Sequence, residues 1–291
     1  MDQDGEAHSV NITSQCRKIT NLTAMQIEHL KRIEVSLPFV ADLAHAYLYL
    51  YVQTKEPGRM LVLKHYRPHT FFSEVELTGE GAFVSTLEEP LIAAAFAKGK
   101  FIQGQREWRF GINLEMYVQP IKCGNDVIGV VSLETGHSYA NSSNYHQLMD
   151  TALYLLDYAK KPLDKDEFHP MSPGTGIIIA DSNNRIVFAN LSANRIYRAL
   201  GIASLVGCRM QDRELSAMLH KETIDSSRPY EREIQIRDFV LVQRDIKLEE
   251  AGMLKRRIML LSDVSELRKK EREIKIKSAV IQEIHHRVKN N

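Results

Sequence analysis

The sequence predicts an α+β protein in which two domains, each an antiparallel sheet with flanking helices, are followed by a C-terminal helix. Three observations support this fold class. Helical periodicity and short β-branched or aromatic segments alternate along both halves of the chain. Residues 161–175 are rich in Pro, Gly and charge, as linkers are. Beyond residue 263, apolar residues recur every seven positions, which is typical of a coiled coil.

The first domain is predicted to span residues 15–160. The preceding segment 1–14 is polar, and we expect it to be disordered. Apolar residues recur at helical spacing over 22–37, which predicts the first helix. Aromatic and β-branched residues then cluster at 47–53 and 60–66, on either side of a Pro-Gly turn. These two segments predict a hairpin.

The rest of the first domain is predicted to contain a second helix, two strands and an exit helix. The second helix covers 88–98, because a Pro lies in its first turn and Gly99 follows its end. Residues 115–122 and 127–133 flank a Gly-Asn-Asp turn, which predicts two antiparallel strands. The segment 144–160 has its apolar residues on one helical face, and we expect it to close the domain.

The second domain is predicted at 176–262, after the linker. It begins with strands at 176–181 and 185–190, which are separated by a Ser-Asn-Asn turn. A helix at 191–200 ends at a Gly. Later strands are expected at 231–241 and 256–261, with a loop at 249–252. This order of elements predicts a small antiparallel sheet with helices on one face.

The last segment, 263–291, is predicted to be a coiled-coil helix through which the chain forms a homodimer. One heptad row, the d row, is wholly apolar and consists of Leu267, Ile274, Ile281 and Val288. The companion a row is mostly polar and consists of Val264, Glu271, Ser278 and His285. This half-apolar seam predicts a marginal coiled coil that can shift during signalling, and it places His286 beside the seam. The alternative is a terminal helix packed on its own domain.

Composition excludes several classes of function. The 291-residue chain has a formal net charge of +1, which argues against direct nucleic-acid binding. Its apolar runs are far shorter than the ~20 residues that span a bilayer, and its acidic N-terminus does not resemble a secretory signal. We therefore expect a cytoplasmic protein without a membrane span. The three cysteines match no zinc-ligand spacing, so no metal site is predicted.

The C-terminal ten residues, 282–291, resemble the phospho-acceptor box of one subfamily of sensor histidine kinases, the HisKA_2 type. In that subfamily the acceptor histidine is followed directly by Arg and then by a Lys-Asn pair. The matching residues are Glu283, His286, Arg287, Lys289, Asn290 and Asn291. The motif is short, but its combination of residue types is specific. The resemblance implies that His286 accepts a phosphoryl group.

Two further resemblances cover most of the remaining chain. Residues 176–198 resemble the opening of a PAS domain, and 261–266 (LSDVSE) resemble the sequence that closes one. Residues 15–155 look like a GAF-type sensory domain, a likeness carried by 41–44 and 118–134. The predicted fold is thus a GAF-like domain and a PAS-like domain in tandem, followed by a signalling helix. This order is similar to that of ethanolamine-responsive sensor kinases.

The resemblance implies a function for the chain as the sensory region of a two-component kinase. Sensing of a small molecule or partner would control ATP-dependent autophosphorylation on His286 and transfer to a response regulator. Some relatives use regulators with an RNA-binding antitermination domain. ATP and Mg would serve the full-length protein. Because the chain stops at Asn291, before any ATP-binding domain, we expect it to bind no cofactor and to be inactive alone.

Side-chain chemistry suggests roles around His286. A neutral imidazole offers one ring nitrogen as a nucleophile. Glu283 lies one helical turn before His286 and is predicted to orient the ring, whereas Lys289 and Asn290 lie one turn after it. Arg287 and Lys289 are predicted to neutralise the incoming phosphoryl group. A metal site at 285–286 is disfavoured because adjacent helical residues point about 100° apart. The alternative is an ordinary pair of surface histidines.

Sensory residues are less sharply defined, and the signal itself is not predicted. Candidate pocket residues are His65, Arg106 and Trp108. They belong to two polar-aromatic clusters. The first consists of His65, Tyr66, Arg67 and His69, and the second of Arg106, Glu107, Trp108 and Arg109. The alternative is a loop with an anchoring Trp and solvated charges.

At the level of the whole chain, the alternative function is a non-enzymatic ligand-binding adaptor whose terminal helix only dimerises.

Overall fold

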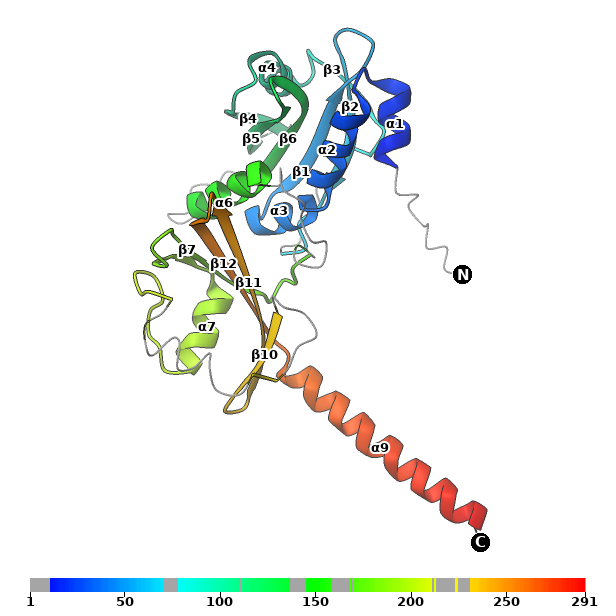
Figure 1. Ribbon diagram of the computed structural model, residues 1–291, viewed down its shortest axis with the longest axis vertical. Coiled ribbons are helices and arrows are strands. Elements are labelled where there is room, and N and C mark those ends of the chain that lie inside the picture. Colours follow the sequence, from blue (N-terminus) through cyan, green and yellow to red (C-terminus); the bar gives the residue numbers. More distant parts are fainter. Residues whose placement is uncertain are drawn as a thin grey trace. The chain divides into compact units, whose positions relative to one another are not determined.

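The computed structural model describes residues 11–70, 78–109, 111–136, 145–158, 168, 170–210, 212, 223–224 and 231–290. The chain divides into two compact units, Met1–Pro173 and Gly174–Asn291, which are drawn in Figure 1. Both are antiparallel sheets with helices, and a long helix ends the second. This confirms the predicted α+β class. Within the described ranges, no helix is both long and apolar enough to cross a lipid bilayer.

The first unit is built on a six-stranded antiparallel sheet with the order β3-β2-β1-β6-β5-β4. Its strands are β1 (Tyr47–Gln53), β2 (Arg59–Tyr66), β3 (Phe83–Ser85), β4 (Ile102–Arg109), β5 (Ile112–Cys123) and β6 (Asp126–Gly136). The hairpin β1–β2 and the hairpin β5–β6 lie where the sequence predicts them. Pairing of β1 with β6 places the two hairpins side by side in one sheet.

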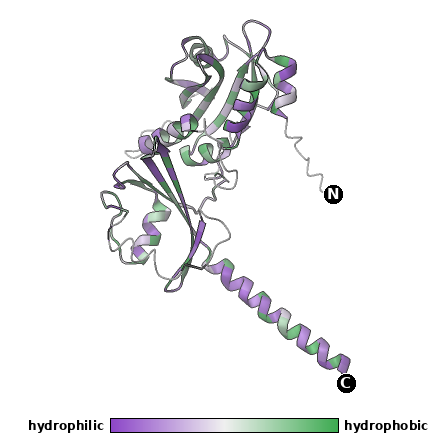
Figure 2. Ribbon diagram, in the orientation of Figure 1, coloured by the Kyte–Doolittle hydropathy of each residue, from purple (hydrophilic) through white to green (hydrophobic). Residues whose placement is uncertain are grey.

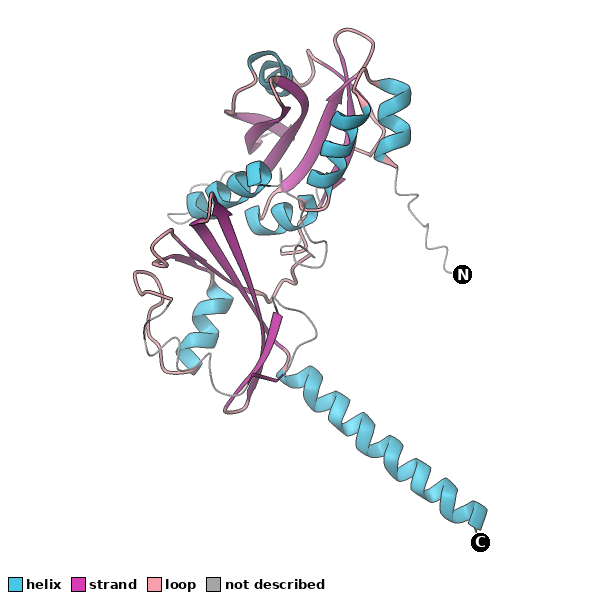
Figure 3. Cartoon of the chain, viewed as in Figure 1, coloured by secondary structure: helices cyan, strands magenta, loops and turns pink. Residues whose placement is uncertain are grey.

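Five described helices cover the two faces of this sheet (Figure 3). They are α1 (Ile12–Ile19), α2 (Ala24–Glu34), α3 (Leu37–Ala44), α4 (Pro90–Lys98) and α6 (Tyr145–Tyr158). Helix α4 packs on the face that carries Tyr49, Met116 and Val130. Leu30 of α2 approaches Gly129, which has the opposite orientation on β6. We call the first surface the α4 face.

The N-terminus differs from the expectation. Residues 1–10 lie outside the described part of the chain, but α1 begins at Ile12, so the prediction of disorder through residue 14 is wrong for its last residues. The Asn11 side chain caps this helix by accepting from Thr13 N at 2.9 Å. Ile12 and Cys16 are buried on its inner face. This amphipathic pattern was not recognised in the sequence because residues 1–14 are mostly polar.

Strand β4 was not predicted, because its sequence IQGQREWR is polar and contains a glycine. The alternative of a loop around Arg106 and Trp108 is therefore wrong. The segment forms a strand because it pairs with β5 over its whole length, although its local β propensity is low. Gly104 has a packing role, since an added Cβ would lie 2.7 Å from Leu91 Cδ1 of α4. The glycine thus lets α4 approach the sheet closely.

The predicted linker, 161–175, is only partly described, since 161–167 and 169 lie outside the described residues. Its described part does not behave as a free linker. Phe168 packs edge-on against Phe39 of α3, with ring centroids 5.4 Å apart, and Met171 is also buried. The first unit consequently extends to Pro173.

The second unit is a six-stranded antiparallel sheet with the order β8-β7-β12-β11-β10-β9. Its elements are β7 (Gly176–Ala180), β8 (Ile186–Ala189), α7 (Leu191–Ala199), β9 (Thr223–Ile224), β10 (Glu231–Ile236), β11 (Phe239–Glu250) and β12 (Met253–Asp263). Helix α7 packs on β7, β11 and β12 through Ile196 and Tyr197. The Asn190 side chain caps this helix by accepting from Ala193 N at 2.9 Å.

A single strand was predicted at 231–241, but the structure has a tight hairpin there. Ile236 pairs with Phe239, so the turn consists of two residues, Arg237 and Asp238. Arg237 has a φ of 53°, in the left-handed region that two-residue hairpins require. Arg is an unusual residue at this position, and the turn therefore gave no local signal. The loop predicted at 249–252 is shorter in the structure: β11 continues through Glu250, and the turn consists of Ala251 and Gly252.

The terminal helix α9 (Ser265–Asn290) begins two residues later than predicted, because β12 continues through Asp263. None of its 26 residues is buried. The backbone around the junction is fixed by two hydrogen bonds, from Val264 N to Val240 O and from Val240 N to Ser265 Oγ, both 2.8 Å. Figure 2 shows that apolar and polar residues alternate along the helix.

Arg268 attaches the first turns of α9 to the second sheet. Its guanidinium binds Glu233 of β10 through Nη2 at 2.6 Å and Glu271 through Nη1 at 2.7 Å.

We expect Arg268→Ala to accelerate amide exchange in residues 265–271 about fivefold, which corresponds to roughly 1 kcal/mol for a partly exposed ion pair. Hydrogen-exchange mass spectrometry measures this effect. Arg272→Ala, on the same helix, is the control; equal acceleration in both variants would contradict the anchoring role.

Candidate phospho-acceptor and sensory sites

Helix α9 presents a broad apolar face to solvent. Seven of its large apolar side chains are 53–70% exposed, namely Leu267, Ile274, Ile276, Val280, Ile281, Ile284 and Val288. Successive residues of an α-helix are rotated by about 100°. The last six of these side chains therefore fall within an arc of about 160°. This arc is wider than a two-stranded seam and has the width typical of a helix in a bundle core.

His286 is on the opposite side of α9 from this apolar face. It lies about 160° from the centre of the arc, and its side chain is exposed. The prediction that His286 lies beside the seam is therefore wrong; His285 is the residue that borders the apolar face. The difference arises because the seam was inferred from a single heptad row. An exposed imidazole on the outer side of the helix is reachable by an external domain.

The predicted neighbours of His286 have different partners from those expected. Glu283 does not contact the imidazole; its Oε1 accepts from Arg287 Nε at 2.8 Å, one turn along the helix. The amide of Asn290 instead lies 3.2 Å from His286 Nδ1. Lys289 is exposed, and Asn291 is outside the described residues. An amide can donate to a bare Nδ1 or, when rotated, accept from Nδ1–H, and the second arrangement leaves Nε2 as the nucleophile.

The three predicted sensory residues lie on the α4 face of the first sheet. His65 of β2 is opposite Tyr49 of β1, with ring centroids 6.4 Å apart. Arg106 and Trp108 share one orientation on β4, two residues apart, and Trp108 packs against the apolar cluster beneath α4. The structure thus brings residues from β2 and from β4, an edge strand of the sheet, to the same face. Of the remaining cluster members, Tyr66 is half-buried and His69 exposed, whereas the side chain of Arg109 is not described.

Arg106 bridges two carboxylates that the sequence did not single out. Its Nη1 binds Glu89, the residue before α4, and its Nη2 binds Glu134 of β6. Ser132 donates to the other oxygen of Glu134 at 3.1 Å. Glu134 is only 1% exposed, so this ion-pair triad crosses the interior of the unit and links α4 to the sheet. A glutamate near the end of the apolar strand VIGVVSLETG was the available signal.

The triad has perturbed electrostatics. Burial raises the pKa of Glu134 to about 7, and the nearby Arg106 opposes this shift. Burial also raises the pKa of Glu89 and lowers the pKa of His65. Among the described residues, Arg106 Nε and His65 Nδ1 are buried without a hydrogen-bond partner. Such atoms normally bind water or a ligand, so the α4 face is a candidate sensory site.

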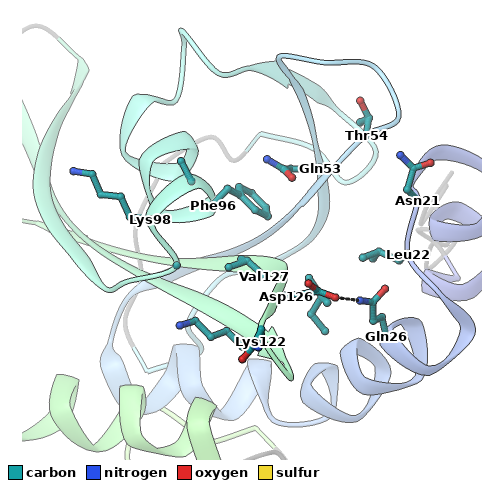
Figure 4. Close-up of a pocket in the computed structure, with 14 residues that line it drawn as sticks. Asn21, Leu22, Gln26, Gln53, Thr54, Phe96, Lys98, Lys122, Asp126 and Val127 are labelled. Atoms are coloured by element: carbon teal, nitrogen blue, oxygen red, sulfur yellow. Dashed lines mark hydrogen bonds between the residues drawn. The ribbon is translucent and has the colours of Figure 1, made fainter.

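A separate groove of about 570 Å³ opens between the start of α2, the end of α4 and the β5–β6 hairpin (Figure 4). Gln26 donates to Asp126 across it at 3.1 Å. Lys98 and Lys122 lie near Gly99, where α4 ends. Lysines at a helix C-terminus interact favourably with its free carbonyls, which gives this pair a structural role. Within the described ranges, no group of three or more His, Cys, Asp or Glu residues could hold a metal ion.

Residues 12–152 match a family model described as the GAF domain of histidine kinase PdtaS. A solved structure described as the sensor region of a sensor histidine kinase aligns with a TM-score of 0.57 at 18% identity. The alignment covers 89% of this chain and 100% of that chain, and it shows a shared fold. Residues 12–152 are therefore similar to the GAF domain of histidine kinase PdtaS, and the chain shares its fold with the sensor region of a sensor histidine kinase.

The similarity extends to particular curated proteins. Sensor histidine kinase PdtaS of Mycobacterium tuberculosis is 24% identical over 300 residues, covering 94% of this chain and 59% of the relative. Sensor histidine kinase PdtaS of Mycolicibacterium smegmatis is 23% identical with the same coverage. The chain thus spans 59% of the length of the curated relatives that it matches.

Proposed function

We propose that this chain senses a signal in its first unit and accepts a phosphoryl group on His286, as part of a two-component sensor histidine kinase. The observation that carries the proposal is the placement of His286 on the exposed polar side of α9, opposite a broad apolar face. A catalytic domain needs access to the imidazole, and a dimer needs the apolar face; this geometry provides both. The similarity to PdtaS proteins supports the same reading.

In this proposal, the second unit is a PAS-like domain and α9 is its output helix. The observed order of strand, strand, helix and further strands is the one that the resemblance implies. Two α9 helices form a homodimer through the apolar face. The full-length protein uses ATP with Mg, works in the cytoplasm and transfers the phosphoryl group to a response regulator. An antiterminator-type regulator is implied by the sequence resemblance alone.

Within the box, we propose that Asn290 orients the His286 ring and that Arg287 and Lys289 supply positive charge to the phosphoryl group. Glu283 acts through Arg287, because its carboxylate holds that guanidinium at 2.8 Å. In the first unit, we propose that a small molecule binds on the α4 face and contacts Arg106 or His65, whose buried nitrogens lack partners among the described residues.

The acceptor role is tested by supplying a separate histidine-kinase catalytic domain with radiolabelled ATP and Mg. We expect acid-labile label on the chain only when the catalytic domain is present. His286→Gln should reduce the label at least about hundredfold, because no other side chain replaces the nucleophile. His285→Gln is the matched control, since it removes the adjacent imidazole on the same helix, and it should retain most of the label.

Two outcomes would contradict the proposal. Label on the chain without the catalytic domain would mean that it contains its own phosphotransferase site. Equal labelling of the native chain and His286→Gln would remove the acceptor role and favour the adaptor alternative, in which α9 only dimerises.

A further inference from the structure

Asp42 of α3 is a fully buried carboxylate that binds two segments far apart in the sequence. Its Oδ1 accepts from the backbone N of His69 at 2.5 Å and lies 3.3 Å from the Nδ1 atom of the same residue. Its Oδ2 accepts from Met171 N at 2.7 Å. Thr70 Oγ1 donates to the Asp42 carbonyl at 3.0 Å. One carboxylate therefore joins the loop after β2 to the end of the first unit.

The segment at His69 lies next to the candidate sensory site, whereas the segment at Met171 leads to the second unit. His69 is 58% exposed and follows β2, the strand that carries His65 of the candidate sensory site. Met171 is buried and lies three residues before Gly174, where the second unit begins. Phe168 holds the same exit segment against Phe39 of α3. His69 is thus open to solvent, whereas Phe168 and Met171 of the exit segment are buried.

A buried carboxylate couples the groups that bind it. Its charge is tolerated in the interior only when its oxygens accept hydrogen bonds. If the loop withdraws its donors from Oδ1, the charge is less well satisfied, and the remaining bond from Met171 to Oδ2 changes in strength. Burial raises the pKa of Asp42, and the backbone bonds from Met171 and His69 oppose that shift. The carboxylate therefore depends on both segments at once.

We propose that Asp42 relays a change in the loop at His69 and Thr70 to the exit segment at Phe168 and Met171, and so carries the sensory state of the first unit toward the second. This inference rests on the proposed sensory function. Asp42 is a positioning residue, since it contacts neither His286 nor the atoms proposed to bind the signal. The competing reading is that Asp42 is a static tie, in which case a disturbance of the loop stays in the loop.

Hydrogen-exchange mass spectrometry on the whole chain distinguishes these readings. Thr70→Val removes one hydroxyl bond at the loop and should accelerate exchange at Met171 about threefold. Thr54→Val is the matched control, because Thr54 Oγ1 also donates to backbone carbonyls, at Glu56 and Arg59, in another exposed turn. It should leave Met171 unchanged. Asp42→Asn offers one oxygen in place of two and should accelerate exchange at both segments about tenfold.

Acceleration at Met171 in Thr70→Val, but not in Thr54→Val, supports the relay. Acceleration confined to the loop in Thr70→Val, or no change at Met171 in Asp42→Asn, overturns it. If Asp42→Asn does not fold, the Thr70→Val comparison still decides. Labelling of His286 by an added catalytic domain is a separate readout: intact labelling without the exchange coupling rejects the relay alone, whereas coupling without labelling rejects the acceptor function alone.

Discussion

Arg106→Met is expected to lower the stability of the first unit by about 3 kcal/mol. Glu89 and Glu134 would then face each other without the guanidinium that binds both, and removal of one partner from a buried ion pair leaves uncompensated charge. For a unit of this size the melting temperature should fall by roughly 10 °C, measured by calorimetry. Arg59→Met is the control, because Arg59 pairs with the exposed Glu56, and its loss should cost less than about 1 kcal/mol.

The same triad gives a pH dependence with a defined sign. The folded-state pKa of Glu134, about 7, is above its ordinary value of 4.5. The folded chain therefore holds a proton that the unfolded chain releases, and this contribution to stability is complete below about pH 4.5 and is lost as the pH rises through 7. Between pH 8 and pH 6 the native chain should gain roughly 1–2 kcal/mol relative to Glu134→Gln. Parallel curves for the two proteins would contradict the raised pKa.

The second large effect is expected from acidic substitutions on the apolar face of α9. The double variant Ile274→Asp and Ile281→Asp places two charges per helix in the proposed interface, where buried unpaired charges are strongly disfavoured. We expect the native chain to sediment as a dimer and the dissociation constant of the variant to rise at least about a hundredfold. Sedimentation equilibrium at micromolar concentration measures this change.

Gln282→Asp is the matched control for dimerisation. It introduces the same charge next to Ile281, but Gln282 lies about 160° from the centre of the apolar face. The control should remain dimeric. A monomeric native chain, or equal dissociation of the variant and the control, would mean that the apolar face serves some contact other than a dimer.

Local patterns predicted the elements that carry strong signals. The hairpin formed by β1 and β2 follows from dense β-branched and aromatic residues and a Pro-Gly turn, and α4 follows from its early Pro and the final Gly99. Strand β4 could not be predicted in this way, because its polar residues become a strand only through pairing with β5. The turn at Arg237 lacks the Gly or Asn that usually marks two-residue hairpins.

The candidate sites were predictable to different degrees. His286 was identifiable as a candidate because its motif is contiguous, but its position opposite the apolar face was not predicted. The true width of the apolar face was missed, since Ile276, Val280 and Ile284 do not belong to the heptad row. The triad of Glu89, Arg106 and Glu134 depends on three elements that only the sheet topology brings together. Asp42 is similar, because its partners lie 27 and 129 residues away.

The absence of buried residues in α9 has a thermodynamic consequence. A segment of 26 residues extends about 39 Å, and past the Arg268 anchor it gains little from its own chain. Solitary helices of this kind fray in water, so in the proposed dimer most of the order of α9 comes from the second copy. Helicity near His286 should then decline on dilution, in step with dissociation. In the proposed dimer, protein concentration would thereby govern whether the segment around His286 is helical.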